Sequence, residues 1–335
     1  MSTVDANAQS SSSLIKDFLH KCGGVAVIDG GFATELERHG ADLNDPLWSA
    51  KCLLTDPHLV RAVHLDYLEA GADIILSSSY QATIQGFKAK GYSLEESESL
   101  LKRSVEIACE ARDVYYTRCC KSSSDHSTDG KVLKQRPILV AASVGSYGAY
   151  LADGSEYSGE YGDAIDLKFL KDFHRRRVQL LAESGADLIA FETVPNKLEA
   201  QAFVELLEEE DIKTPAWLSF NSKDGINVVS GDSLSECAAI GESCGKVLAV
   251  GINCTPPRFI LDLIRSINQT HKEERNCRGE LVLLTHRNIR FCYTAWEHIR
   301  QFWAYNTCLS WTIMPSLSWT NASTDRGHGA MCVSC

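Results

Sequence analysis

The chain has 335 residues, of which 44% are hydrophobic, so it can bury a full-sized core as one α/β barrel or as two smaller domains. Its formal net charge of -11 disfavours a nucleic acid or an anionic membrane surface as the main partner. The sequence holds no apolar run of bilayer length, so we expect neither a membrane span nor a membrane partner.

Residues 1–12 are polar, and they lack both the apolar centre of a secretory leader and the Arg-rich pattern of a transit peptide. We therefore predict a short disordered tail there and a cytoplasmic location for the protein. The 13 cysteines would stay reduced in that compartment. A group of cysteines then indicates a metal site or catalysis rather than a disulfide framework.

Short apolar runs alternate with longer amphipathic stretches from Leu14 to about Thr270. This pattern is typical of repeated βα units that build a parallel sheet. We predict six strands in this region, at Val25–Ile28, Asp73–Ser77, Ile138–Ala142, Asp187–Phe191, Ala216–Phe220 and Leu248–Ile252.

Polar side chains follow several of these strands. The first strand ends in Asp29, and the two glycines after it either let a ligand approach the backbone or simply make a tight turn. Residues 67–80 and 181–193 resemble each other, since in both a helix ends at Gly, a strand follows, and polar residues come next. The polar residues are Ser78–Gln81 in one unit and Glu192–Thr193 in the other. Such repetition fits a barrel.

The sixth predicted strand runs into Asn253 and Cys254, and two prolines then prevent a ladder or a helix from continuing directly. A thiol at the carboxyl end of a parallel strand lies where α/β proteins place their chemistry. A lone cysteine is more often a small, buried core residue, so this position needs support from the rest of the chain.

Two other stretches invite a functional interpretation. The long loop 143–162, rich in Gly and Tyr, is typical of a substrate lid or wall, with a flexible surface excursion as the alternative. Cys119, Cys120 and His126 look like a metal cluster. They follow a helix predicted over Leu100–Tyr116, which places them at the amino-terminal face of the sheet, so we interpret them as a mobile insertion.

Four segments, taken together and in order, resemble the homocysteine S-methyltransferase family, its plant members most closely, over roughly residues 12–269. They are Asp29-Gly-Gly-Phe-Ala-Thr-Glu, Gly145-Ser-Tyr-Gly-Ala-Tyr-Leu-Ala-Asp-Gly-Ser-Glu-Tyr, Phe191-Glu-Thr-Val-Pro-Asn-Lys-Leu-Glu-Ala200 and Gly251-Ile-Asn-Cys-Thr-Pro-Pro. The resemblance implies a (β/α)8 TIM-type barrel and a Zn2+ cofactor. It also implies transfer of a methyl group from S-methylmethionine, or less efficiently S-adenosylmethionine, to homocysteine, which gives methionine. Zinc would deprotonate the homocysteine thiol and hold it in place.

The resemblance also implies roles for single residues. Cys254 would be the first zinc ligand and the catalytic thiolate. Asp29 and Glu192 would bind the homocysteine amino group or line its pocket. Ser143, Thr193 and Asn253 complete the predicted substrate-binding set.

The sequence departs from the family near residue 270. The family's Gly-Gly-Cys-Cys segment, which supplies its other two zinc ligands, does not occur in this chain. We predict a barrel domain over residues 13–270 with about six family-like units, the last two being replaced by a divergent tail at 271–335. A frame shift or an alternative splice would explain the change. Leu281–Thr285 could supply a strand, and Cys332 with Cys335 could substitute for the missing ligand pair.

We therefore predict weak or absent methyltransferase activity for this chain. Two alternatives remain open. One is a non-catalytic truncated isoform that binds an amino-acid substrate or a protein partner. The other is a different barrel enzyme that uses Glu192 as an acid or a base.

Overall fold

The computed structural model describes residues 15–122, 135–273 and 284–285. The chain divides into two compact units, Met1–Ile289 and Arg290–Cys335, and every described residue belongs to the first. The predicted disordered tail at residues 1–12, His126, Cys332 and Cys335 all lie outside the described ranges.

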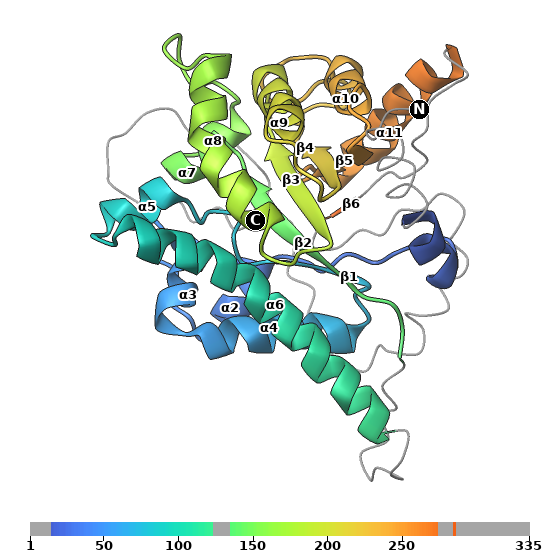
Figure 1. Ribbon diagram of the computed structural model, residues 1–335. Helices are drawn as coiled ribbons and strands as arrows, with labels where there is room; N and C mark the ends of the chain where they lie inside the picture. Colours follow the sequence, from blue (N-terminus) through green and yellow to red (C-terminus); the bar gives the residue numbers. More distant parts are fainter. Residues whose placement is uncertain (1–14, 123–134, 274–283, 286–335) are drawn as a thin grey trace, which may run out of the picture. The chain divides into compact units, whose positions relative to one another are not determined.

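The described part of the first unit is built on a parallel sheet whose strands follow one another in chain order (Figure 1). Every pair of neighbouring strands is parallel, so each connection must cross over from the end of one strand to the start of the next. The strands are β1 (Ile74–Leu76), β2 (Leu139–Gly145), β3 (Leu188–Val194), β4 (Ala216–Phe220), β5 (Val247–Asn253) and β6 (Leu284–Thr285).

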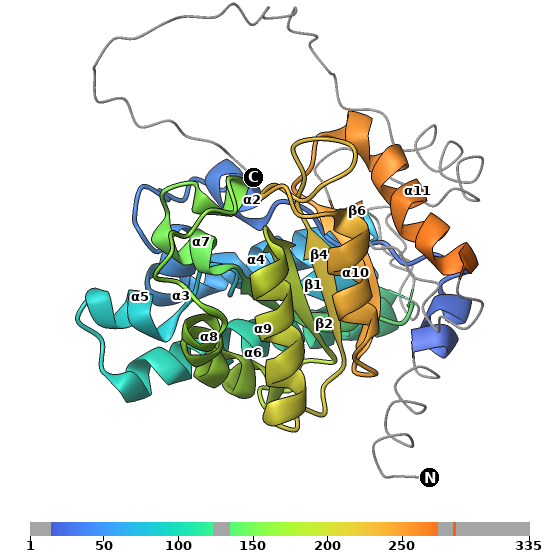
Figure 2. The same cartoon turned by 90° about the horizontal axis from the view of Figure 1, so that it is seen from above.

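The helices that make these crossovers pack in the same order as the strands. Along the chain, α4 packs against α6, α6 against α8, α8 against α9, α9 against α10, and α10 against α11 (Figures 1 and 2). The sheet is therefore wound in one direction, as in βα barrels, and its order never reverses as it does in doubly wound folds. The described residues establish this parallel α/β architecture, and a closed eight-stranded ring is not part of what they show.

The helix bounds follow local capping signals. For example, α4 begins at a proline and ends before Gly71, whose φ of 107° lies in the left-handed region that glycine favours. The helices are α2 (Phe32–Arg38), η1 (Trp48–Lys51), α3 (Cys52–Thr55), α4 (Pro57–Ala70), α5 (Ile84–Ala89), α6 (Leu94–Ser122), α7 (Tyr147–Leu151), η2 (Ser155–Tyr157), α8 (Leu167–Ala182), α9 (Lys197–Glu209), α10 (Leu234–Glu242) and α11 (Pro257–Glu273). A further helical segment covers residues 15–21. Among the described residues, no helix is long and apolar enough to cross a bilayer.

The first predicted strand, Val25–Ile28, is reduced to an isolated parallel bridge between Ile28 and Ile74. The ladder stays short because the side chain of Asp73 replaces a backbone partner. Its Oδ2 accepts from the backbone N of Val27 at 2.9 Å. The position of the chain is as predicted, next to β1, but a regular strand does not form.

Two predictions about the segment around Cys119 and Cys120 were wrong, namely the bounds of its helix and its interpretation as a mobile insertion. The helix predicted over Leu100–Tyr116 is α6, which begins earlier because Ser93 and Glu96 form a capping box. It also continues to Ser122, so Cys119 and Cys120 lie within the helix and not in a mobile insertion, and Cys119 is buried.

Beyond residue 270 the sheet continues, since β6 pairs with β5 through Ile252 and Asn253 and includes the end of the predicted strand Leu281–Thr285.

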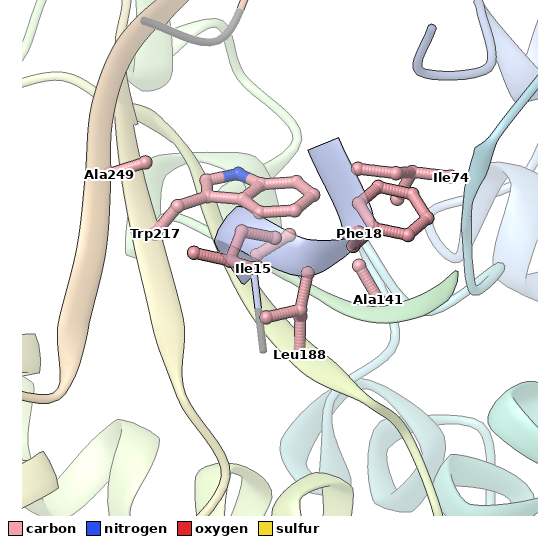
Figure 3. Close-up of a cluster of buried hydrophobic side chains, with 8 residues drawn as sticks. Ile15, Phe18, Ile74, Ala141, Leu188, Trp217 and Ala249 are labelled. Carbon is pink, nitrogen blue, oxygen red and sulfur yellow. The ribbon is translucent and has the colours of Figure 1, made fainter. Parts of the chain in front are cut away.

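The interior of the sheet is apolar near the amino ends of the strands. The helical segment 15–21 directs Ile15 and Phe18 toward Trp217 of β4 and Leu188 of β3 (Figure 3). Ile15 and Trp217 also line a small cavity with an entirely apolar wall. This segment therefore closes the amino-terminal end of the sheet, and the opposite, carboxyl end is left for polar residues.

Candidate active site

The interior face of the sheet changes from apolar to polar along each strand. Residues two apart on a strand share a face. Buried or half-buried polar residues lie at the carboxyl ends of the strands. They come two positions after the core residues Ala141, Ala190 and Trp217 and four positions after Ala249. They are Ser143 on β2, Glu192 on β3, Ser219 on β4 and Asn253 on β5. Three of these four positions were predicted as substrate-binding, and they come together at one end of the sheet.

Two acidic residues lie at this end. The hydroxyl of Ser143 donates to Oε1 of Glu192, and Oδ2 of Asp29 accepts from the backbone N of Leu76 at 2.8 Å. The other oxygen of Asp29, Oδ1, is buried without a hydrogen-bond partner among the described residues. Burial raises the pKa of Glu192 to about 7, and burial followed by the charge of Glu192 raises the pKa of Asp29 well above its usual range. The charge of Arg177 offsets the burial of Glu192 only in part, so a positively charged ligand would stabilise the ionised form of both carboxyl groups.

Cys254 lies directly after β5, and its backbone is unusual. Its φ is 46°, and Thr193 at the end of β3 has a φ of 58°, both in the left-handed region that side chains other than glycine seldom adopt. The register of β3 against β4 shifts at the same point, between Phe191 and Val194. Asn253 holds the two strand ends together, because Oδ1 accepts from the backbone N of Thr193 at 2.9 Å and Nδ2 donates to its Oγ1 at 2.8 Å.

The sulfur of Cys254 receives two hydrogen bonds. Oγ1 of Thr193 lies 3.6 Å from Sγ and Nδ2 of Asn253 lies 3.5 Å from it. These donors favour a thiolate, but burial outweighs them, and the charges of Glu192 and Glu156 act in the same direction as burial. Together they raise the pKa of the thiol to about 11. At neutral pH the group is therefore a protonated thiol unless a positive charge comes close.

The described residues do not by themselves fit a zinc site. They bring no three His, Cys, Asp or Glu side chains together in a geometry that could hold a metal ion. Cys254 would supply one sulfur ligand, whereas a structural or catalytic zinc needs at least three protein ligands. The predicted substitute pair, Cys332 and Cys335, lies outside the described residues.

Arg177 of α8 is a functional candidate that the sequence reasoning missed. Its guanidinium is buried and donates to the backbone O of Ser79 at 2.9 Å, of Tyr80 at 2.7 Å and of Gly145 at 3.1 Å. It thereby fixes the backbone after β1 and at the end of β2. Burial lowers its pKa to about 10. The sequence pattern that could have identified Arg177 is the helical periodicity of α8, which places it on the same buried face as Leu170, Phe173 and Leu181.

Glu199 of α9 was missed as well. Its buried carboxylate accepts from the backbone N of Tyr147 at 2.6 Å, from the hydroxyl of Tyr161 at 2.6 Å and from Nε2 of His174 at 2.8 Å. From the sequence, Glu199 is expected to be an ordinary residue of the first turn of α9, because Asn196 caps this helix. The side chain of Asn196 accepts from the backbone N of Glu199. The side chain of Glu199 instead holds loop 143–162, which contains α7 and η2 and is therefore not a flexible excursion.

Comparison with known proteins agrees with this architecture. The family model described as homocysteine S-methyltransferase matches residues 26–300. The chain belongs to the homocysteine S-methyltransferase family. The match runs past residue 270, near which the sequence resemblance was expected to end.

Several relatives in this family are very similar to the chain. A homocysteine S-methyltransferase 2 of Arabidopsis thaliana is 75% identical over 255 residues, which are 76% of this chain and 76% of the relative. A selenocysteine methyltransferase of Astragalus bisulcatus is 74% identical over 254 residues, 76% of this chain and 75% of the relative. Among solved structures, the metallated form of the homocysteine methyltransferase MmuM from Escherichia coli has a TM-score of 0.66 and 36% identity, and the alignment covers 79% of this chain and 92% of that one.

Proposed function

We propose that this protein transfers a methyl group from S-methylmethionine, or less efficiently S-adenosylmethionine, to the sulfur of homocysteine. The acceptor sulfur attacks the methyl carbon, and the bond from that carbon to the donor sulfur breaks. The electron pair stays on the donor sulfur, which becomes a neutral thioether, and the thiol proton of the acceptor is released. With S-methylmethionine as the donor, both products are methionine.

The observation that carries the proposal is the grouping of Cys254, Glu192 and Thr193 at the carboxyl ends of β3 and β5, which are separated by β4, in a chain of this family. Glu192 and Asp29 would bind the ammonium group of homocysteine, because both carboxyl groups are buried and the charge of Arg177 offsets the burial of Glu192 only in part. Asn253 and Thr193 would hold the sulfur of Cys254 in place. The protein then needs mainly to align the two substrate sulfurs with the methyl carbon.

We further propose that the activity is weak. A zinc ion would deprotonate the acceptor thiol, but the described residues of this site offer it a single cysteine sulfur, and the family's Gly-Gly-Cys-Cys segment does not occur in the sequence. A chain that binds amino-acid substrates without transferring methyl groups is the second candidate. The same shortage of thiolates beside Cys254 favours it.

The test is an assay of the purified full-length chain with methyl-labelled S-methylmethionine and homocysteine, together with its zinc content. Cysteine and selenocysteine should serve as additional acceptors, because relatives named for both kinds of acceptor are about equally similar. We expect slow transfer and less than one zinc per chain. Stoichiometric, tight zinc binding with rapid transfer would contradict the proposed impairment, and binding of homocysteine without any transfer would favour the second candidate.

The matched variants are Cys254→Ser and Cys120→Ser. Cys120 is exposed on α6 and lies outside the site, so its loss controls for the removal of a thiol. We expect Cys254→Ser to lower transfer by about 100-fold or more, and Cys120→Ser to leave it within about twofold. Unchanged transfer after Cys254→Ser would instead point to a different enzyme that uses Glu192 as an acid or a base.

A further inference from the structure

Three oxygen atoms near the carboxyl end of β4 are buried and have no hydrogen-bond partner among the described residues. They are Oγ of Ser219, Oδ1 of Asn221 and Oε2 of Glu156. Asn221 is fully buried, and its Nδ2 donates to the backbone O of Glu156 at 2.7 Å. The backbone of the loop residue Glu156 is therefore tied to the end of β4, and one of its side-chain oxygens, Oε2, has no partner among the described residues.

These atoms lie next to Cys254. Phe220 pairs with Ile252, so Asn221 is level with Asn253, the residue before the thiol. The backbone N of Ser222 donates to Oγ1 of Thr255 at 2.9 Å, which fixes the two chain segments on the other side of the thiol. The charge of Glu156 acts on both Tyr80 and Cys254, which places its carboxylate at the same mouth.

The unpartnered atoms call for a positively charged ligand. A carboxylate oxygen and an amide oxygen can only accept, and a buried acceptor without a partner costs free energy of folding. Burial and the charge of the neighbouring acidic residue Asp153 both raise the pKa of Glu156, and no Lys or Arg among the described residues offsets them. The local field is therefore negative, and a cation would relieve it.

The mouth contains a second acidic group, Glu192 on β3. Thr193, which directly follows Glu192, contacts Sγ of Cys254, and so does Asn253, which is level with Asn221. Glu192 on β3, Asn221 after β4 and Cys254 after β5 thus lie at the carboxyl ends of three successive strands, with Asn221 in the middle. A methyl transfer between two amino acids needs two such places, because the acceptor and the donor must approach the methyl carbon from opposite directions.

We propose that Glu156 and Asn221 form a second cation-recognition site, which takes the sulfonium-bearing methyl donor while Glu192 and Asp29 take the acceptor. This inference rests on the proposed function. Glu156 is then a specificity-determining residue, since its negative charge favours a sulfonium over the neutral thioether of the same skeleton. The preference disappears once the methyl group has left, so the same carboxylate assists release of the product.

The test is an equilibrium binding measurement on the full-length chain with S-methylmethionine and with methionine, which has the same skeleton but an uncharged sulfur. Glu156→Gln keeps the size and the backbone contact of the residue and removes the charge. We expect this variant to weaken binding of S-methylmethionine by about 10- to 100-fold and binding of methionine by less than about threefold. Homocysteine binding should stay within about twofold of the original.

The matched control is Glu160→Gln, which removes a carboxylate from an exposed position of the same loop and should change none of these affinities. Circular dichroism checks that each variant is folded. Equal weakening of S-methylmethionine and methionine would overturn the inference, because the charge on sulfur would then not be what Glu156 reads. If the original chain transfers methyl groups but Glu156→Gln leaves donor binding unchanged, the inference fails and the proposed function stands. If the original chain binds no sulfonium donor, both fail.

Discussion

At the scale of single residues, the site depends on groups that are held in unfavourable states. Thr193 and Cys254 adopt left-handed backbone conformations, and such strain persists only where the surrounding contacts fix it. The contacts here are the two hydrogen bonds between Asn253 and Thr193. Glu192 is held in a second unfavourable state, because its carboxylate is removed from water and receives one hydroxyl group in return.

The raised pKa of Glu192 predicts a pH-dependent stability. Its pKa rises from 4.5 to about 7, so between these values the folded chain keeps a proton that the unfolded chain has lost. Stability should therefore fall as the pH rises through this window. Glu192→Gln removes the effect, so the free energy of unfolding of the original chain should drop by about 1–3 kcal/mol relative to this variant between pH 5 and pH 8.

Urea unfolding at the two pH values measures this difference, and Glu160→Gln again serves as the control with an exposed carboxylate. The control should follow the original chain at both pH values. A Glu192→Gln variant whose stability shifts with pH as much as that of the original chain would show that Glu192 ionises normally.

At the scale of elements, loop 143–162 is fixed by the two helices next to it, α8 and α9. Glu199 of α9 accepts hydrogen bonds from the backbone N of Tyr147, the hydroxyl of Tyr161 and the ring of His174, which belongs to α8. The ring of Tyr147 packs edge-on against Tyr161 and Phe173. One buried carboxylate thus connects two helices to the loop that carries Glu156.

Replacing Glu199 by Gln should loosen this loop. The amide offers one accepting oxygen to donors that previously shared two, so we expect the free energy of unfolding to fall by about 1–3 kcal/mol. Chymotrypsin should then cut the Tyr-rich loop faster. Glu205→Gln on the same helix breaks an ion pair with Lys171 near the surface and should cost less than about 1 kcal/mol. Similar losses for both variants would mean that Glu199 does not hold the loop.

How much could be predicted from the sequence follows from how local each signal is. The strands were found because their apolar runs are contiguous, but β2 and β3 extend three residues beyond the predicted ends. Those extra residues include Glu192, which is polar because it faces the site. Each apolar run ends where the polar residues of the site begin. The end of the run therefore predicts the position of the site better than it predicts the end of the strand.

The rest of the site could not be predicted because it depends on contacts between distant residues. Arg177 and Glu199 bind groups that are 25 to 98 residues away along the chain, and no local pattern reports such a pairing. Asn221 follows a strand without any motif of its own. The position of Cys254, by contrast, could be predicted, since the prolines after it end the strand at a definite place.

At the scale of the whole unit, the amino-terminal segment 15–21 completes the core. Phe18 is 5% exposed and packs with Ile15 and Trp217 inside the sheet (Figure 3). In a sheet wound in one direction, the side chains that point inward need a cover at the end opposite the site. The segment supplies this cover although it precedes the first strand.

Phe18→Ala should therefore destabilise the unit strongly for a residue outside the sheet. We expect a loss of about 2–4 kcal/mol in the free energy of unfolding, measured with urea, because the substitution leaves a cavity in the apolar core. Ile226→Ala, at a position that is 67% exposed, should change it by less than about 0.5 kcal/mol. If the two substitutions cost the same, the segment does not belong to the core.

The pairing of β5 with β6 has one more consequence. Two residues of β6 cover the last part of β5, next to Asn253 and the thiol that follows it. A chain shortened before residue 284 would leave β5 at the edge of the sheet. Its unpaired backbone groups could then form hydrogen bonds with a strand of a second molecule. The cysteine that the proposed chemistry requires would then lie beside an exposed edge strand, and self-association would compete with the entry of substrate.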